Sequence, residues 1–228
     1  SAFHTRFEHS VGVFNRKKEV ILKLLQKPNW KKHVEDNNLK VYLIAELIKS
    51  AGHDIGHLPL SHVLELSLLH KPGFHEEIGK KILLETPELQ ECYKSIHPDL
   101  QKALAESFEA DVFGIRALDE GNFDLDRLDY LTRDSLYSST PFNIDLPNFE
   151  IIDINTDFSG IPMKNDDGCI VRSNCNNTHK KKICVFDYNS LDTLVNFLIA
   201  RVNAYKNLYF SPTIFIFSYS SLVKSVYL

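Results

Sequence analysis

A segment rich in histidine and acidic residues, 50–65, directly follows an apolar helical pattern that runs from Val41 to Ile48. Three histidines and two acids fall within thirteen residues of this segment. Its His-Asp pair at positions 53 and 54 places an imidazole and a carboxylate, two metal-ligand types, at a helix end. An isolated His-Asp pair is more often a polar loop after a helix, so a metal site is predicted only if other segments supply further ligands.

Apolar residues recur at helical spacing along most of the chain, which predicts a mainly α fold, a helical bundle. The stretch 29–38 is polar and is expected to form a loop in which Trp30 is a local anchor. From Ser190 onward, one apolar stripe is formed by Leu191, Leu194, Val195, Leu198 and Val202. Helices are expected at 11–26, 39–49, 75–84, 125–137 and from 190, with two more between 86 and 117.

The pattern changes in the middle of the chain, where 149–154 and 183–186 have the composition of short strands. A third strand is expected around 169–172, which would give a small antiparallel β insert. We therefore divide the chain into a helical core (1–148), a β-hairpin-like insert (149–188) and a C-terminal helical part (189–228). This last part is expected to complete a substrate pocket and to be truncated.

Composition argues against several classes of protein. The chain has 228 residues, 43% of them hydrophobic, and a net charge of −4, so no general basic field indicates a nucleic-acid partner. The four cysteines show no CxxC spacing, which favours free thiols in a reducing compartment. With no signal peptide and no apolar run of about 18 residues, we expect no membrane contact and a cytoplasmic or nuclear location.

Four residues from three segments are candidate metal ligands: His9, His53, Asp54 and Asp126. Two neutral imidazoles and two carboxylates suit one divalent ion such as Mn, Fe, Mg or Zn. Taken singly, His9 is more often a half-buried histidine at a helix end, and Asp126 is one acid among thirty. The four gain weight only as a set.

Three motifs in this order carry a family resemblance: Thr-Arg-Phe-Glu-His-Ser at 5–10, His-Asp-Ile-Gly-His at 53–57, and Asp-Arg-Leu-Asp-Tyr at 126–130. Over roughly 2–210 the chain resembles the HD-domain deoxynucleoside triphosphate triphosphohydrolases, the dGTPase-like family. The resemblance implies an HD-domain helical core and one divalent metal ion. It also implies a homo-oligomer, dimer or tetramer, that hydrolyses a dNTP to deoxynucleoside and inorganic triphosphate.

The resemblance also assigns roles by position. The metal ligands are the four residues named above, and His75 matches the general acid. His57 and His62 match histidines near the α-phosphate, with Glu65 supporting His62 one helical turn away. Asp129 and Arg133, at i and i+4, are interpreted instead as a structural ion pair. Substrate-binding positions are Arg6, Arg127, Tyr130, Asp134, Arg201, Tyr205 and Tyr209, with Arg201 and Tyr205 opposite the apolar stripe and Tyr209 against the sugar 2′ position.

Two other functions remain open at this point. One is an HD-type nucleotidase or phosphodiesterase that acts on monophosphates or cyclic nucleotides. The other is a non-catalytic paralogue that binds a nucleotide or nucleic acid and retains the metal site. Release of triphosphate from dGTP in the presence of Mn distinguishes the three.

Overall fold

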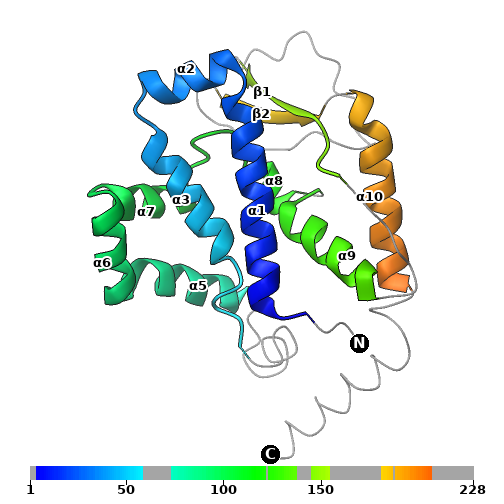
Figure 1. Cartoon of the computed structure of the whole chain (residues 1–228), viewed down its shortest axis with the longest axis horizontal. Coiled ribbons are helices and arrows are strands. Elements are labelled where there is room, and N and C mark those ends of the chain that lie inside the picture. Colours follow the sequence, from blue (N-terminus) through cyan, green and yellow to red (C-terminus); the bar gives the residue numbers. More distant parts are fainter. Residues whose placement is uncertain are drawn as a thin grey trace, which may run out of the picture.

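The computed structural model describes residues 4–58, 73–121, 123–137, 145–154, 181–186 and 188–206. It is mostly helical with one small antiparallel sheet, as the sequence predicts. Helix α1 runs through the middle of the molecule, with α3 on one side and α9 and α10 on the other (Figure 1). None of the helices in these ranges is long and apolar enough to cross a membrane.

Helix α1 (Arg6–Leu25) begins with a capping box, in which Thr5 and Glu8 bond reciprocally to each other's backbone N–H. This satisfies two of the helix's unpaired amide donors. The helix packs against α2, α3 and α9. Its buried side chains recur at helical spacing and point into the core: His9, Val13, Lys17, Val20, Ile21 and Leu24.

The expected loop at 29–38 is instead a helix, α2 (Pro28–Asp36). Pro28 occupies the first turn, where a missing N–H costs no hydrogen bond. Trp30 is an anchor, since it is buried and lies 5.5 Å from Phe113 between ring centroids. The loop prediction failed because tertiary burial of Trp30 and Val34 stabilises a segment whose remaining residues are polar.

Four helices build an apolar cluster that is separate from the core into which α1 points. They are α3 (Lys40–Ala51), α5 (Phe74–Glu85), α6 (Pro87–Ile96) and α7 (Leu100–Glu109). Within the cluster, α5 packs against α6 and α7, and Leu83 of α5 lies beside Gly52 at the end of α3, next to the His-Asp pair. The buried members of the cluster are Ala45, Leu83, Tyr93, Leu100, Ala103 and Leu104.

A buried ion cluster joins α1 and α3 to the short helix α8 (Ala117–Glu120). The side chain of Lys17 is fully buried, and its Nζ lies 2.7 Å from Asp119 Oδ1 and 3.1 Å from Glu46 Oε2. Lys49 Nζ lies 3.0 Å from the other oxygen of Glu46. Each buried charge therefore has an opposite charge beside it, which offsets the cost of leaving water.

Helix α9 (Leu125–Tyr137) has the predicted bounds, and the two predicted strands are β1 (Phe149–Ile154) and β2 (Lys181–Phe186). They pair antiparallel, from Phe149 opposite Phe186 to Ile154 opposite Lys181. The expected third strand at 169–172 lies outside the described residues.

Helix α10 (Leu191–Ala204) follows a short 3₁₀ turn, η2 (Tyr188–Ser190), and packs against α9. Its buried residues are Phe197, Ala200 and Ala204, and Phe197 lies 4.7 Å from Phe123. The sequence-based prediction that an apolar stripe of α10 packs on the core is wrong for four of its five residues. Exposed are Leu191, Val195, Leu198 and Val202, whereas Leu194 is partly buried.

Candidate metal centre

Three segments of the chain bring two histidines and an aspartate together. His9 lies in the first turns of α1, His53 in the turn after α3, and Asp126 in the first turn of α9. His9 Nε2 is 2.8 Å from Asp126 Oδ1 and 3.3 Å from His53 Nε2. His53 Nε2 is 3.6 Å from the same Asp126 oxygen. One ligand atom from each of the three residues therefore faces a common point.

The ring orientations fit a metal ion. His9 Nδ1 lies 2.8 Å from Asp129 Oδ2, and His53 Nδ1 lies 2.9 Å from the carbonyl oxygen of Ser50. Both partners are acceptors, so each Nδ1 carries a proton and donates it, which leaves Nε2 to act as a ligand. A metal with bonds of about 2.1 Å holds neighbouring ligand atoms about 3.0–3.4 Å apart, similar to the spacing in this cluster.

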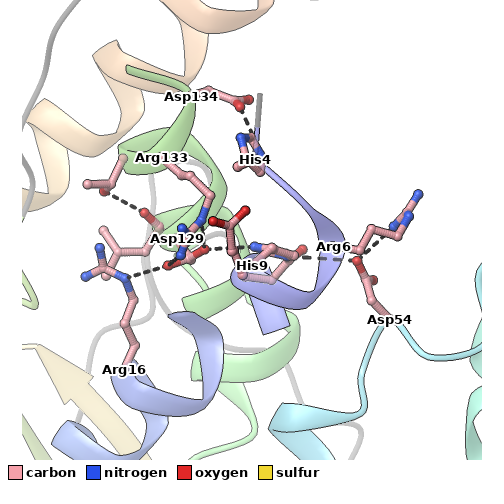
Figure 2. A network of polar contacts seen from close by, with 12 residues as sticks. His4, Arg6, His9, Arg16, Asp54, Asp129, Arg133 and Asp134 are labelled. Carbon is pink, nitrogen blue, oxygen red and sulfur yellow. Dashed lines mark hydrogen bonds and ion pairs between the residues drawn. The ribbon is translucent and has the colours of Figure 1, made fainter. Parts of the chain in front are cut away.

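Asp54 borders the cluster. Its oxygens lie 3.5 Å from His53 Nε2 and 3.9 Å from His9 Nε2. Asp54 Oδ2 also accepts a hydrogen bond of 3.0 Å from the guanidinium of Arg6 (Figure 2). Arg6 thus contacts a candidate ligand directly and lies at the edge of the site, where it is half exposed.

The close carboxylates change the proton affinity of the histidines. Burial opposes a charge on His9, but hydrogen bonds with Asp126 and Asp129 outweigh it and raise its pKa to about 9. The pKa of His53 is also raised, because Asp126 and Asp54 outweigh its burial. The two histidines in turn hold the pKa of Asp126 below its ordinary value despite burial. Asp126 therefore stays ionised at neutral pH, and an ion that binds His9 Nε2 must displace the proton that the raised pKa of His9 retains there.

Asp129 has a role that the sequence analysis missed. The predicted ion pair with Arg133 is confirmed, with Arg133 Nε 3.0 Å from Asp129 Oδ2. The same carboxylate also accepts the Nδ1 proton of His9, and Arg16 Nε lies 3.7 Å from its other oxygen (Figure 2). Hydrogen bonds from His9 and Arg133 overcome its burial and lower its pKa. The i,i+3 spacing from Asp126 to Asp129 was the available signal.

His57 and His75 lie beside this centre. The two rings stack with 3.9 Å between centroids and 10° between planes. His57 Nε2 is 3.2 Å from Asp54 Oδ1, and its side chain is almost fully buried. The His-Asp turn reaches α5 closely at Gly56, where a Cβ atom would lie only 2.0 Å from the His75 carbonyl oxygen. This contact fixes His75 relative to the metal-ligand candidates.

Arg127 is held near the start of α9. Its Nη1 donates to the Gly121 carbonyl oxygen at 2.7 Å and forms a short ion pair with Asp124. Asp124 also accepts the backbone N–H of Arg127 at 2.7 Å. Burial raises the pKa of Asp124 to about 6, although Arg127 opposes the shift. Both side-chain bonds use Nη1, and a guanidinium has five N–H donors, so the arginine retains donors for an anion.

The other substrate-binding candidates lie on α9 and α10. Burial and a side-chain hydrogen bond with Tyr205 raise the pKa of Tyr130, one turn after Asp126 on α9. The guanidinium of Arg201 lies 5.9 Å from the Tyr205 ring centroid. Asp134, two turns after Asp126, lies 3.6 Å from His4 Nε2. An open hollow of about 570 Å³ is lined by Leu198, Arg201, Val202, Tyr205 and Lys206.

The expectation that Arg201 and Tyr205 lie opposite the apolar stripe of α10 is wrong. Both residues line the same hollow as Leu198 and Val202, two members of that stripe. Three other candidates, His62, Glu65 and Tyr209, lie outside the described residues.

No family model matches the chain. It is 34% identical over 178 residues to an HD domain-containing protein of Acanthamoeba polyphaga mimivirus, covering 70% of this chain and 39% of that protein. It is 31% identical over 148 residues to the deoxynucleoside triphosphate triphosphohydrolase SAMHD1 homolog of Dictyostelium discoideum, covering 60% of this chain and 28% of that protein.

Among solved structures, the chain is similar to a phosphohydrolase from Bacteroides thetaiotaomicron. The match has a TM-score of 0.60 and 26% sequence identity, and covers 94% of this chain and 44% of that one. The chain thus spans less than half the length of each of these three relatives.

Proposed function

We propose, from the membership of this chain in the HD-domain phosphohydrolase family, that it hydrolyses a deoxynucleoside triphosphate to deoxynucleoside and inorganic triphosphate in a metal-dependent reaction. The observation that carries the metal-dependent part is the convergence of His9 Nε2, His53 Nε2 and Asp126 Oδ1, with both Nδ1 atoms engaged elsewhere. The triphosphate substrate is supported by the order of the three sequence motifs and by the similarity to the Dictyostelium deoxynucleoside triphosphate triphosphohydrolase homolog.

His9, His53 and Asp126 would hold the ion, with Asp54 as the fourth ligand. A bound divalent ion supplies Lewis-acid activation of a phosphate oxygen and of water. In the reaction, a bond forms between the water oxygen and the α-phosphorus, and the bond to the 5′-oxygen breaks. His75 gives its proton to the leaving 5′-oxygen and recovers one from solvent, which also takes up the proton lost by the attacking water.

The remaining residues of this chain bind and orient the substrate. His57 contacts Asp54 and stacks on His75, which supports a role for it beside the α-phosphate. Arg6, Arg127 and Arg201 would offset the charge of the triphosphate through charge-assisted hydrogen bonds. The family resemblance assigns Tyr130 and Asp134 to the deoxyribose, Tyr205 to the sugar and base, and Tyr209 to the 2′ position.

The test is product analysis. The metal-depleted chain is incubated with Mn and separately with dGTP, GTP, dGMP and a cyclic nucleotide, and products are resolved by anion exchange. We expect intact triphosphate from dGTP, less from GTP, and no product with Asp126→Ala. Turnover of dGMP or the cyclic nucleotide without triphosphate release would favour the nucleotidase or phosphodiesterase alternative. Binding of dGTP without turnover would favour the non-catalytic one.

A further inference from the structure

The side chain of His9 is clamped on both sides by aspartates from one helix. Its Nε2 faces Asp126 Oδ1 at 2.8 Å, and its Nδ1 faces Asp129 Oδ2 at 2.8 Å. The two aspartates are three residues apart on α9, so their side chains lie on the same face of that helix. Helix α9 thus supplies both a metal-ligand candidate, Asp126, and the carboxylate of Asp129, which holds the second candidate, His9.

We propose that Asp129 is a positioning residue of the metal centre. By accepting the Nδ1 proton of His9 it fixes the tautomer and the ring orientation in which Nε2 faces the ion. A carboxylate in this position also makes the imidazole a stronger ligand. The inference rests on the proposed metal-dependent function and adds to it a residue that touches neither metal nor substrate.

The surroundings of Asp129 suit a fixed carboxylate. It is buried, and Arg133 binds both of its oxygens, with Nε 3.0 Å from Oδ2 and Nη2 3.2 Å from Oδ1. Arg16, about two turns after His9 on α1, brings a second guanidinium close, with its Nε 3.7 Å from Asp129 Oδ1. Such pairing offsets the cost of burying the charge and leaves the carboxylate little freedom to turn away from His9.

Gly12 makes the contact sterically feasible. It lies on α1 three residues after His9, where α1 and α9 pack together. A Cβ atom at Gly12 would lie 2.0 Å from Asp129 Oδ1 and 2.4 Å from Arg133 Nη2. Any larger residue would therefore push the carboxylate and its guanidinium partner away from His9.

Two variants test the proposal by titration of the whole chain with Zn and with Mn. Asp129→Asn conserves shape but removes the charge, and we expect metal affinity to fall about 10–100-fold. Gly12→Ala retains every chemical group of the site and favours helix over glycine. We nevertheless expect it to lower metal affinity, because it displaces Asp129.

The control is Glu46→Gln, which removes another buried, ion-paired carboxylate that contacts no candidate ligand. It should lower thermal stability and leave metal affinity unchanged. In the Zn-loaded protein, ¹⁵N NMR should show the proton of His9 on Nδ1, and Asp129→Ala should remove the low-field signal of that hydrogen bond.

Unchanged metal affinity in both Asp129→Asn and Gly12→Ala would overturn the inference, as would an equal loss in Glu46→Gln. These outcomes leave the metal site itself intact provided that Asp126→Ala abolishes binding in the same assay. A parent chain that binds neither Zn nor Mn would instead reject the proposed function.

Discussion

His57 and His75 stack face to face, with 3.9 Å between ring centroids and 10° between the ring planes. They come from different segments, since His57 follows the His-Asp pair and His75 lies in the first turn of α5. Because His57 also contacts Asp54, the stack links the proposed general acid to the metal-ligand candidates. Replacing His75 should consequently affect the proton-transfer step without removing a ligand.

For His75→Ala we expect turnover to fall by about 10²–10⁴-fold, the usual contribution of a general acid. Metal affinity should remain near that of the parent, because His75 is not among the atoms of the ligand cluster. Steady-state hydrolysis and metal titration of the same preparation measure the two quantities. Parental turnover in this variant would remove His75 from the mechanism.

Gly56→Ala should disturb the contact between the His-Asp turn and α5. The added Cβ would meet two backbone atoms, the His75 carbonyl oxygen at 2.0 Å and the Gly79 nitrogen at 2.4 Å, which cannot rotate away. We expect a loss of about 1–3 kcal/mol in the free energy of unfolding, as for other overpacked sites, and reduced turnover.

The matched control for this change is Gly79→Ala on the opposite side of the contact. Its Cβ would lie at ordinary distances, 3.5 Å from Gly56 N and 3.6 Å from Ile55 Cγ2. Alanine also favours helix by about 1 kcal/mol, so this variant should be at least as stable as the parent. Denaturant unfolding compares the two, and equal effects would contradict the steric explanation.

Lys17→Met should be strongly destabilising, because Glu46 and Asp119 lose the fully buried cation between them. They retain Lys49, whose Nζ lies 3.0 Å from Glu46 Oε1 and 3.6 Å from Asp119 Oδ2. Removing one partner of a buried pair costs about 3–5 kcal/mol. The double variant Lys17→Met, Asp119→Asn should recover part of this loss of stability. Denaturant unfolding of the single and double variants measures both terms, and additive losses would mean that the two side chains do not interact.

The same lysine predicts a pH dependence. Burial opposes its charge, but Asp119 and Glu46 outweigh it, so the pKa of Lys17 is raised above its ordinary value. A group with a raised pKa stabilises the fold fully below its unfolded pKa and loses that contribution only as pH rises through the folded pKa. The difference in stability between parent and Lys17→Met should therefore stay constant from about pH 7 to pH 9. A difference that shrinks over this interval would contradict the assignment.

A pair of neighbouring residues tests which face of α10 packs on the core. Phe197 is fully buried against Phe123, so Phe197→Ala should cost about 3–5 kcal/mol in the free energy of unfolding. Leu198 is 48% exposed, and Leu198→Ala should change stability by less than about 0.5 kcal/mol. Thermal or denaturant unfolding measures both, and the reverse order would restore the orientation expected from the sequence.

This helix also shows where prediction from sequence stops. The bounds of α9 and the existence of β1 and β2 followed from local periodicity and turn residues, which act over a few positions of chain. Helix α10 carries apolar residues on two faces, and periodicity alone cannot tell which one packs. The buried face carries Ala200 and Ala204, whose small side chains let α10 approach neighbouring elements closely. Such packing depends on the neighbouring element and cannot be read from the hydrophobicity of α10.

The site shows the same limit. Residue types and motif order pointed to four ligands, His9, His53, Asp54 and Asp126. The fold brings three of them together in one cluster, and Asp54 lies at its border. The contact of Asp129 with His9 spans 120 residues of sequence and was not foreseen, because local spacing explains only its pairing with Arg133. Which atom of a buried acid faces which ring depends on how α1 and α9 pack.

The capping box of α1 has a consequence for insertions and deletions. Thr5 and Glu8 define where the helix begins, and His9 follows immediately, while Lys17 lies two turns further along the same face. A residue gained or lost between Thr5 and Glu8 would break the capping box. Because a helix turns by about 100° per residue, one gained or lost between His9 and Lys17 would rotate His9 out of line with Lys17. Either the ligand or the buried lysine would then face the wrong side. Length variation should therefore be tolerated before Thr5 and rejected within the following twelve positions of this helix.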